Sequence, residues 1–205
     1  MLELDEHFNC EEAFENERTW WTPDQWREVR DLYRDFARKN TAGTHQVAKD
    51  IIFDFSEIAV PFQAGEEKGR GLRAARDILE GEVVYRQTNN TIVFTDGLVY
   101  RKFLFALEER FPTFACDIMI WNWMDDLDAD DRSKFGIVVD LNDHNLINTA
   151  DEDEDVNVRC ALVGDEIDCH DGTFYASRSI RKGEELVTDY GDFVSPSHTW
   201  DEMGL

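Results

Sequence analysis

The stretch that decides the fold lies near the end of the chain, where a turn glycine precedes a short apolar run that ends in a tyrosine beside a second glycine. It reads Lys182-Gly183-Glu184-Glu185-Leu186-Val187-Thr188-Asp189-Tyr190-Gly191. The pattern predicts a short strand over 185–188 with Tyr190 just beyond its end. A tyrosine at the end of a strand usually serves packing, so this stretch alone is weak evidence for catalysis.

A second glycine motif lies more than a hundred residues earlier, at Lys68-Gly69-Arg70-Gly71-Leu72. Two glycines one residue apart let backbone amides approach a ligand closely, and the flanking Lys and Arg add positive charge. The dinucleotide-binding fingerprint is excluded because Arg73-Ala74 stands where its third glycine belongs. Taken alone, a plain turn explains the motif equally well.

Read together and in order, the two segments resemble the two ends of a SET domain. The opening is similar in Gly69-x-Gly71 followed by Ala75-x-Asp77-Ile78-x-x-Gly81-Glu82. The close is similar in Phe174-Tyr175-Ala176-x-Arg178-x-Ile180-x-x-Gly183-Glu184-Glu185-Leu186-x-x-Asp189-Tyr190-Gly191. The resemblance covers residues 58–193, and the family is that of the SET-domain protein-lysine methyltransferases.

The middle motif of the family, an Asn-His-Ser followed by Pro-Asn, is altered in this chain. One register places it at Leu146-Ile147-Asn148-Thr149-Ala150 with Val156-Asn157 as the later pair, so that Thr149 replaces the His and Ala150 the Ser. A second register runs from Asn142-Asp143-His144 to Asn148-Thr149. We prefer the first, because Asn157-Val158 then leads directly into the next predicted strand.

The resemblance implies methyl transfer from S-adenosylmethionine, with Tyr190 as the catalytic residue that orients the lysine amine. The residues that it assigns to the cofactor are Lys68, Gly69, Arg70, Gly71, Asn148, Thr149, Tyr190 and Trp200. Gly69 and Arg70 would meet the methionine part, and Asn148 the adenosine part. Members of the family often carry zinc modules that supply part of the site, and this chain has none, so the resemblance makes Trp200 of the tail a candidate lid over the site. Packing of Trp200 in the core is an equal alternative. The family also threads its closing segment through a loop formed by the middle motif.

The fold class that we expect is mainly β with small helices, a SET-type β-clip with an N-terminal helical extension. Strands are expected over 58–62, 83–85, 91–94, 136–141, 157–163, 173–176 and 185–188, with a hairpin turn at Asp171-Gly172. Thr22 and Gln25 predict a capped helix that ends near Asn40, and Asp96 predicts a second one that stops before Pro112. We expect three divisions of the chain. Residues 1–57 would form an acidic arm (1–17) and a helix, residues 58–193 the SET-like domain, and residues 194–205 a short tail.

Composition restricts the partners of the chain. Its 205 residues carry 21 Lys and Arg against 45 Asp and Glu, a formal charge of −24, and 12% aromatic residues indicate a folded protein. Such a charge opposes direct binding to nucleic acid or to an anionic membrane and favours a basic protein or peptide, with a histone tail as one candidate. Lys68, Arg70, Arg73 and Arg76 would form a basic corner for a cofactor carboxylate.

Metal and disulfide sites are not expected. The acidic runs at 126–130 and 151–155 lack the glycine and glutamate of a calcium loop, and Cys169-His170 has no partners at ligand spacing. Four scattered cysteines without a C-x-x-C pair favour a reduced chain inside the cell, nuclear or cytoplasmic. Two other functions remain open: an inactive SET-like module that binds a basic protein, and a methyltransferase for a non-histone protein.

Overall fold

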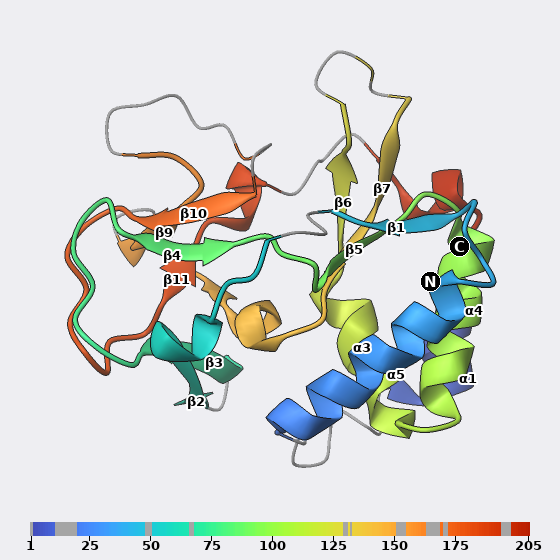
Figure 1. The fold of residues 1–205 in the computed structure, drawn as a ribbon, viewed down its shortest axis with the longest axis horizontal. Helices are drawn as coiled ribbons and strands as arrows, with labels where there is room; N and C mark the ends of the chain where they lie inside the picture. The colour runs from blue at the N-terminus through green and yellow to red at the C-terminus, as the bar shows by residue number, and fades with distance from the viewer. Residues whose placement is uncertain are drawn as a thin grey trace. The chain divides into compact units, whose positions relative to one another are not determined.

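The computed structural model describes residues 2–10, 20–47, 51–65, 68–128, 131, 133–150, 155–162, 169, 172–193 and 198–205. The chain divides into two compact units (Figure 1). Unit 1 comprises residues 1–47, 90–142 and 195–205, and unit 2 comprises residues 48–89 and 143–194. No described helix is long and apolar enough to cross a membrane.

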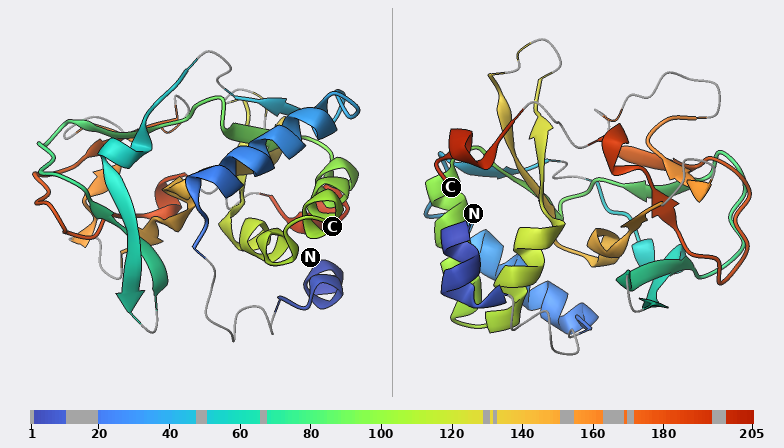
Figure 2. Two further views of the ribbon diagram at one scale, coloured as in Figure 1. Left: turned by 60° about the horizontal axis from the view of Figure 1, so that its bottom comes forward. Right: turned by 180° about the vertical axis from the view of Figure 1, so that it is seen from behind.

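In its described residues, unit 1 combines four α-helices with an antiparallel sheet. The helices are α1 (Leu2–Phe8), α3 (Pro23–Ala37), α4 (Gly97–Glu108) and α5 (Pro112–Trp121), and Figure 2 shows them gathered together. The sheet has the order β1 (Thr44–Gln46), β5 (Thr91–Phe94), β7 (Phe135–Asp140) and β6 (Trp123–Asp126). A 3-10 helix, η5 (Trp200–Met203), packs against the same aromatic-rich core.

The two predicted helices begin where their caps were expected. The hydroxyl of Thr22 accepts a hydrogen bond from the backbone N–H of Gln25, whose side chain accepts one from the backbone N–H of Thr22 at 2.9 Å. Asp96 accepts from the N–H groups of Leu98 and Val99 at the start of α4. These bonds satisfy backbone donors that a helix leaves open at its N-terminus, so both predictions are confirmed.

Two expectations, one for the N-terminal segment and one for the cysteines, were wrong. Residues 1–17 were expected to form a solvated arm, but α1 buries Leu4 and Phe8, one turn apart on one face, and Cys10 is joined to Cys116 by a disulfide. The cysteines were expected to be reduced, yet all four are paired, the second pair being Cys160 and Cys169. α4 ends at Glu108, before Pro112 as predicted, and Pro112 begins a further helix, α5, which was not predicted, because proline suits the first turn of a helix. Residues 11–17 lie outside the described part of the chain.

The described strands of unit 2 form three small sheets. They pair β2 (Ala59–Gly65) with β3 (Gly69–Ala74), β10 (Thr173–Ala176) with both β4 (Val83–Arg86) and β9 (Val158–Arg159), and β8 (Asn148–Thr149) with β11 (Val187–Thr188). Only the last pair is parallel among the described strands. Short 3-10 helices complete the unit: η1 (Phe55–Glu57), η2 (Asp143–Leu146) and η4 (Tyr190–Asp192).

Among the described elements short strands outnumber the helices, so the expected β-rich class with small helices is confirmed. β5 and β10 have the predicted bounds, whereas the glycine motif at 69–71, read as a turn or ligand loop, starts strand β3. Bridges from Arg73 to Glu185 and from Ile78 to Ile180 join the opening and closing segments. The domain boundaries at 58 and 193 stay a prediction, and the turn at Asp171-Gly172 lies partly outside the described residues.

Candidate functional site

The two glycines of the opening motif serve different needs. Gly69 has φ +67°, which favours glycine, and a Cβ built on it would have no neighbour within 4 Å. A Cβ on Gly71 would lie 2.9 Å from the Asn148 side-chain nitrogen and 3.0 Å from a Glu185 carboxylate oxygen. Gly69 therefore sets the backbone beside open space, and Gly71 lets three segments approach one another.

Asn148 joins the opening and closing motifs. Its side-chain Nδ2 donates to the carbonyl oxygen of Arg70 at 3.2 Å and to Oε1 of Glu185 at 3.0 Å. Its backbone lies opposite Val187 in the parallel pairing of β8 and β11. Residues that are 78 and 37 positions away in sequence thus meet at one amide side chain.

The closing segment lies between the two arms of the middle motif. On one side Thr188 pairs with Thr149, and the N–H of Ala150 donates to the carbonyl of Thr188 at 2.9 Å. On the other side buried Asn157 accepts from the N–H of Val187 at 2.9 Å and donates to the carbonyl of Glu185 at 2.8 Å. This arrangement agrees with the first register of the middle motif, whose Asn148 and Asn157 both contact the closing segment.

His144, the key residue of the second register, has a packing role. It is buried on η2, and its ring stacks on Tyr85 with centroids 3.4 Å apart and planes 6° apart. Phe55 and Phe174 complete an aromatic cluster around it. The structure places His144 within the core of unit 2.

Tyr190 begins the turn η4, directly after β11. Its hydroxyl donates to the carbonyl oxygen of Ile147 at 2.7 Å, next to Asn148 in the chain. Burial of this hydroxyl raises the pKa of Tyr190 above its ordinary value of 10.0. The residue as a whole is 41% exposed, so its hydroxyl is held inside while part of the ring stays accessible. Tyr190 is therefore a neutral, fixed hydroxyl at an accessible position.

The structure brings three of the predicted site residues, Arg70, Asn148 and Tyr190, together through residues 147–149. Arg70 and Tyr190 both contact this segment through hydrogen bonds, and Thr149 lies exposed beside Asn148. Trp200, the remaining predicted cofactor residue, belongs to unit 1 and packs against its core, as the packing alternative anticipated. Its role as a lid stays a prediction.

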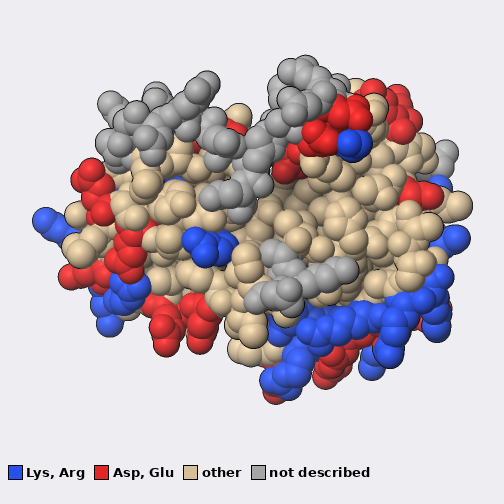
Figure 3. All heavy atoms as spheres, turned by 45° about the horizontal axis from the view of Figure 1, so that its top comes forward, with Lys and Arg blue, Asp and Glu red and all other residues tan. Residues whose placement is uncertain are grey.

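The expected basic corner is less open than the sequence suggested. Arg70 is buried, and Arg73 lies over the ring of Phe62. Arg76 forms an ion pair with Glu82, which lowers the pKa of that carboxyl. In the view of Figure 3, Lys and Arg gather along one edge of the molecule. On α3, the exposed arginines Arg27, Arg34 and Arg38 each pair with an aspartate three residues earlier.

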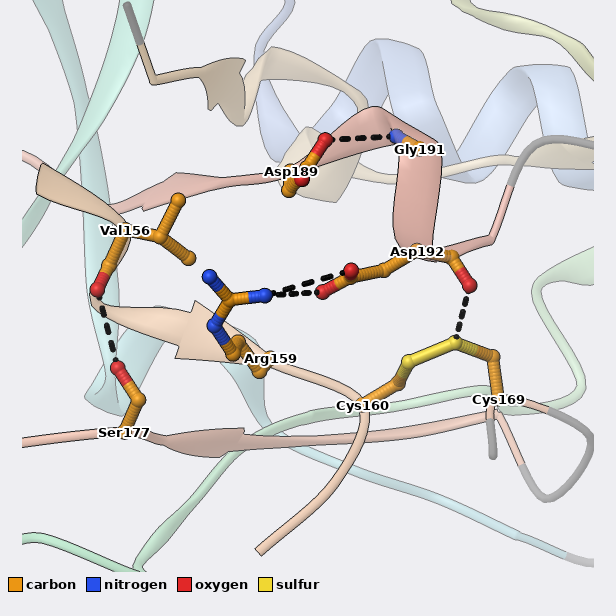
Figure 4. Close-up of polar contacts among 8 residues, drawn as sticks. All are labelled: Val156, Arg159, Cys160, Cys169, Ser177, Asp189, Gly191 and Asp192. Carbon is orange, nitrogen blue, oxygen red and sulfur yellow. Dashed lines mark hydrogen bonds and ion pairs between the residues drawn. A yellow bond between two sulfur atoms is a disulfide. The ribbon is translucent and has the colours of Figure 1, made fainter. Parts of the chain in front are cut away.

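The sequence analysis did not identify two sets of charged side chains near the predicted site residues. One is Glu185, whose side chain accepts from Asn148; its motif position was recognised, but not its contact. The other is the ion pair between Arg159 and Asp192, which lies beside the disulfide of Cys160 and Cys169 (Figure 4). Only the charged residue directly after the Tyr-Gly pair hinted at the second group.

The residues present fit S-adenosylmethionine in their chemistry. The open space beside Gly69 admits a ligand to the backbone, and the neighbouring Lys68 carries a positive charge that suits a carboxylate. Asn148 and Thr149 present backbone groups next to them. Among the described residues, no group of three or more His, Cys, Asp or Glu side chains could hold a metal ion. The acidic run at 151–155 lies mostly outside the described residues.

Comparisons with solved structures found Polycomb Repressive Complex 2 proteins. Chaetomium thermophilum Polycomb Repressive Complex 2 bound to GSK126 is 24% identical, with 84% of this chain and 20% of that chain covered and a TM-score of 0.40. A humanized mutant of the same complex bound to the inhibitor GSK343 is 26% identical, with 73% and 16% covered and a TM-score of 0.39. The ctPRC2 in an autoinhibited conformation bound to S-adenosylmethionine is 27% identical, with 66% of this chain and 15% of that chain covered and a TM-score of 0.38.

The TM-scores of these three structures are below 0.5, and this chain spans only 15% to 20% of the lengths of the three chains. A search of curated proteins found no match. The family model of the SET domain, by contrast, matches residues 69–191, more than half of the chain and within the predicted 58–193. This chain belongs to the SET-domain family.

Proposed function

We propose that this protein transfers a methyl group from S-adenosylmethionine to a lysine side chain of a basic protein, with a histone tail as the first candidate. The observation that carries the proposal is the fixed hydroxyl of Tyr190, which donates to Ile147 beside Asn148 at the meeting point of the family's three motifs. The residues that would hold the cofactor are Lys68, Gly69, Arg70, Gly71, Asn148, Thr149 and Tyr190.

The chemistry requires a neutral amine with its lone pair directed at the methyl group. S-adenosylmethionine, when bound, supplies this methyl on a sulfonium. A lysine amine is protonated at neutral pH because its pKa is about 10.4. A dry channel lowers that pKa, because desolvation disfavours the ammonium form.

Tyr190 can fix the orientation of such an amine. A phenol has a single O–H donor, and that of Tyr190 is engaged with the carbonyl of Ile147. Toward a substrate its oxygen is therefore an acceptor, which can receive an N–H of the amine and leave the nitrogen lone pair free to point elsewhere. Because burial raises the pKa of Tyr190, the hydroxyl stays neutral at physiological pH and does not trap the ammonium form by charge.

Replacement of Tyr190 tests this role. Tyr190→Phe should leave folding and cofactor binding near those of the parent and reduce methyl transfer by about 100-fold or more, as expected when an oriented group is lost. Tyr175→Phe on β10 is the matched control and should retain activity. The measurement is incorporation of radiolabelled methyl into a panel of basic proteins that includes purified core histones. Equal rates for the parent and Tyr190→Phe would contradict the role assigned to this hydroxyl.

A second function, an inactive module that binds a basic protein, is favoured by one observation. Thr149 and Ala150 stand where the family has His and Ser, although the backbone of this segment still pairs with β11. Calorimetry with S-adenosylmethionine distinguishes the two functions. We expect binding, and no detectable heat at millimolar cofactor would rule out the enzyme and leave the module.

The charge of −24 supports a basic partner in either case, because opposite charge accelerates encounter. We expect association with a basic peptide to slow as salt rises. Replacing the acids at 151–155 by Asn and Gln should weaken this salt dependence, which stopped-flow measurements of association would show. Identical kinetics for parent and variant at all salt concentrations would mean that these acids do not attract the partner.

A further inference from the structure

The turn that carries Tyr190 has little internal support. η4 is a three-residue 3-10 helix, capped by Asp189, which accepts from the N–H of Gly191 at 2.8 Å. The bonds from Asp192 N–H to Asp189 and from Phe193 N–H to Tyr190 measure 3.1 and 3.3 Å. Hydrogen bonds of 3-10 geometry are weaker than those of an α-helix, so the position of this turn depends on contacts from outside it.

Arg159 supplies such a contact from the neighbouring strand. Its Nη1 lies 3.0 Å and 3.3 Å from the two carboxylate oxygens of Asp192, the last residue of η4 (Figure 4). The Asp192 side chain is only 7% exposed and that of Arg159 22%, so water screens this pair little. Charge-assisted bonds of this kind are strong, and removing one partner leaves a buried charge.

The Arg159 side chain is itself anchored. Arg159 lies on β9 opposite Tyr175 of β10, and the next residue, Cys160, is joined to Cys169 by a disulfide. The Sγ of Cys169 lies 2.8 Å from the carbonyl oxygen of Asp192. Both the side chain and the main chain of Asp192 are therefore contacted from the region around Arg159, as Figure 4 shows.

We propose that Arg159 is a positioning residue that acts through Asp192 to hold Tyr190 in its reactive place. Asp192 follows Tyr190 by two residues in the same short turn, so a shift of Asp192 moves the tyrosine ring away from the carbonyl of Ile147. This proposal rests on the proposed function for its catalytic meaning, but its structural part is independent of any activity.

The first test follows the ionisation of Tyr190 directly. Tyrosinate absorbance is recorded against pH for the full chain, and the curve of the corresponding Tyr190→Phe protein is subtracted to isolate Tyr190. In Arg159→Ala we expect the pKa of Tyr190 to fall toward its ordinary value, because a freed hydroxyl becomes hydrated. Arg159→Lys should restore part of the shift. Arg178→Ala, which removes a more exposed ion pair with Glu184, is the matched control and should leave the pKa of Tyr190 unchanged.

The second test separates positioning from binding in the reaction. With purified core histones as acceptor, Arg159→Ala should lower kcat by about 10- to 100-fold, the cost of a misplaced reacting group, with KM and cofactor affinity near those of the parent. If Arg159→Ala does not fold, Asp192→Asn carries the same comparisons, because it keeps the side-chain shape and removes the charge.

The outcomes distinguish the two proposals. A parent without methyl transfer would refute the proposed function, yet the titration would still decide whether Arg159 holds Tyr190. An unchanged pKa of Tyr190 in a folded Arg159 or Asp192 variant would overturn the positioning role. A rise of KM at unchanged kcat would do so too, because it would assign Arg159 to substrate binding.

Discussion

At the scale of single residues, Gly71 makes the sharpest stability prediction. The Cβ of Gly71→Ala would lie 2.9 Å from the Cβ of Ala64 and from Nδ2 of Asn148. The Ala64 side chain cannot rotate away, so β2 or the Asn148 bridge must shift. Overpacking of this kind costs about 1–3 kcal/mol of unfolding free energy, and urea denaturation measures it. An unchanged urea midpoint would show that the site has room that the structure does not indicate.

Two tyrosines predict the response to alkaline pH. Burial raises the pKa of Tyr33, against a smaller lowering by its hydrogen bond to Thr44, and burial also raises that of Tyr190. Between the ordinary value of about 10 and the raised value, the unfolded chain has lost a proton that the folded chain keeps. The unfolding free energy should therefore fall as pH rises above about 10. Tyr33→Phe should reduce that fall, and urea midpoints across this range check it; an equal decline would contradict the assignment.

The candidate site was only partly predictable at this scale. Tyr190 and Asn148 were identified from motif spacing, which is a local property of the sequence. The carbonyl of Ile147 that holds Tyr190 and the carboxylate of Glu185 that holds Asn148 were not, because these contacts depend on the register of β8 against β11. Likewise, the close approach at Gly71 involves three other segments of the chain, those of Ala64, Asn148 and Glu185, whereas the sequence shows only a single glycine there.

At the scale of elements, the N-terminus of α3 tests the capping argument. Thr22→Ala removes the acceptor for Gln25 N–H, and the reciprocal bond loses its geometry. The expected loss is about 1 kcal/mol of unfolding free energy. Glu28→Ala, at an exposed position within the same helix, is the control and should change stability by less than about 0.5 kcal/mol. Equal effects of the two substitutions in urea denaturation would show that the cap contributes nothing specific.

Elements with strong local signals were predicted, and those defined by their partners were not. α3 and α4 carry caps and helical spacing, and β5 and β10 are apolar runs. By contrast, β8 has two residues and exists through its pairing with β11, which lies 39 positions later. α1 was hidden by its acidic residues, because only Leu4 and Phe8 mark its buried face among the described side chains.

At the scale of the whole molecule, neither unit is continuous in sequence. Residues 90–142 interrupt unit 2 and belong with the N-terminal helices in unit 1. A local pattern cannot report such an arrangement, since each helix and strand looks the same whichever core it joins. The predicted boundary at 57 was placed where the sequence changes to short strand-like segments punctuated by glycine. The core of unit 1 instead contains Leu4, Phe94 and Leu141, which lie on both sides of that boundary.

The two disulfides give a prediction that belongs to this scale, because each closes a loop within one unit. Cys10 and Cys116 are 106 positions apart and Cys160 and Cys169 only 9. Loop-closure entropy gives about 4.7 kcal/mol for a loop of roughly 100 residues and about 3 kcal/mol for one of 15, so the first disulfide should stabilise the fold more.

The double variant Cys10→Ala/Cys116→Ala should therefore lose more unfolding free energy than Cys160→Ala/Cys169→Ala, measured in denaturant without reductant. The short disulfide should instead matter at the turn of Tyr190, since Cys169 contacts Asp192 there. Loss of the short disulfide should lower the pKa of Tyr190, whereas loss of the long disulfide in unit 1 should leave that pKa unchanged. Equal stability losses would refute the loop-closure argument, and four titratable thiols in the unreduced, denatured protein would show that the cysteines are not paired at all.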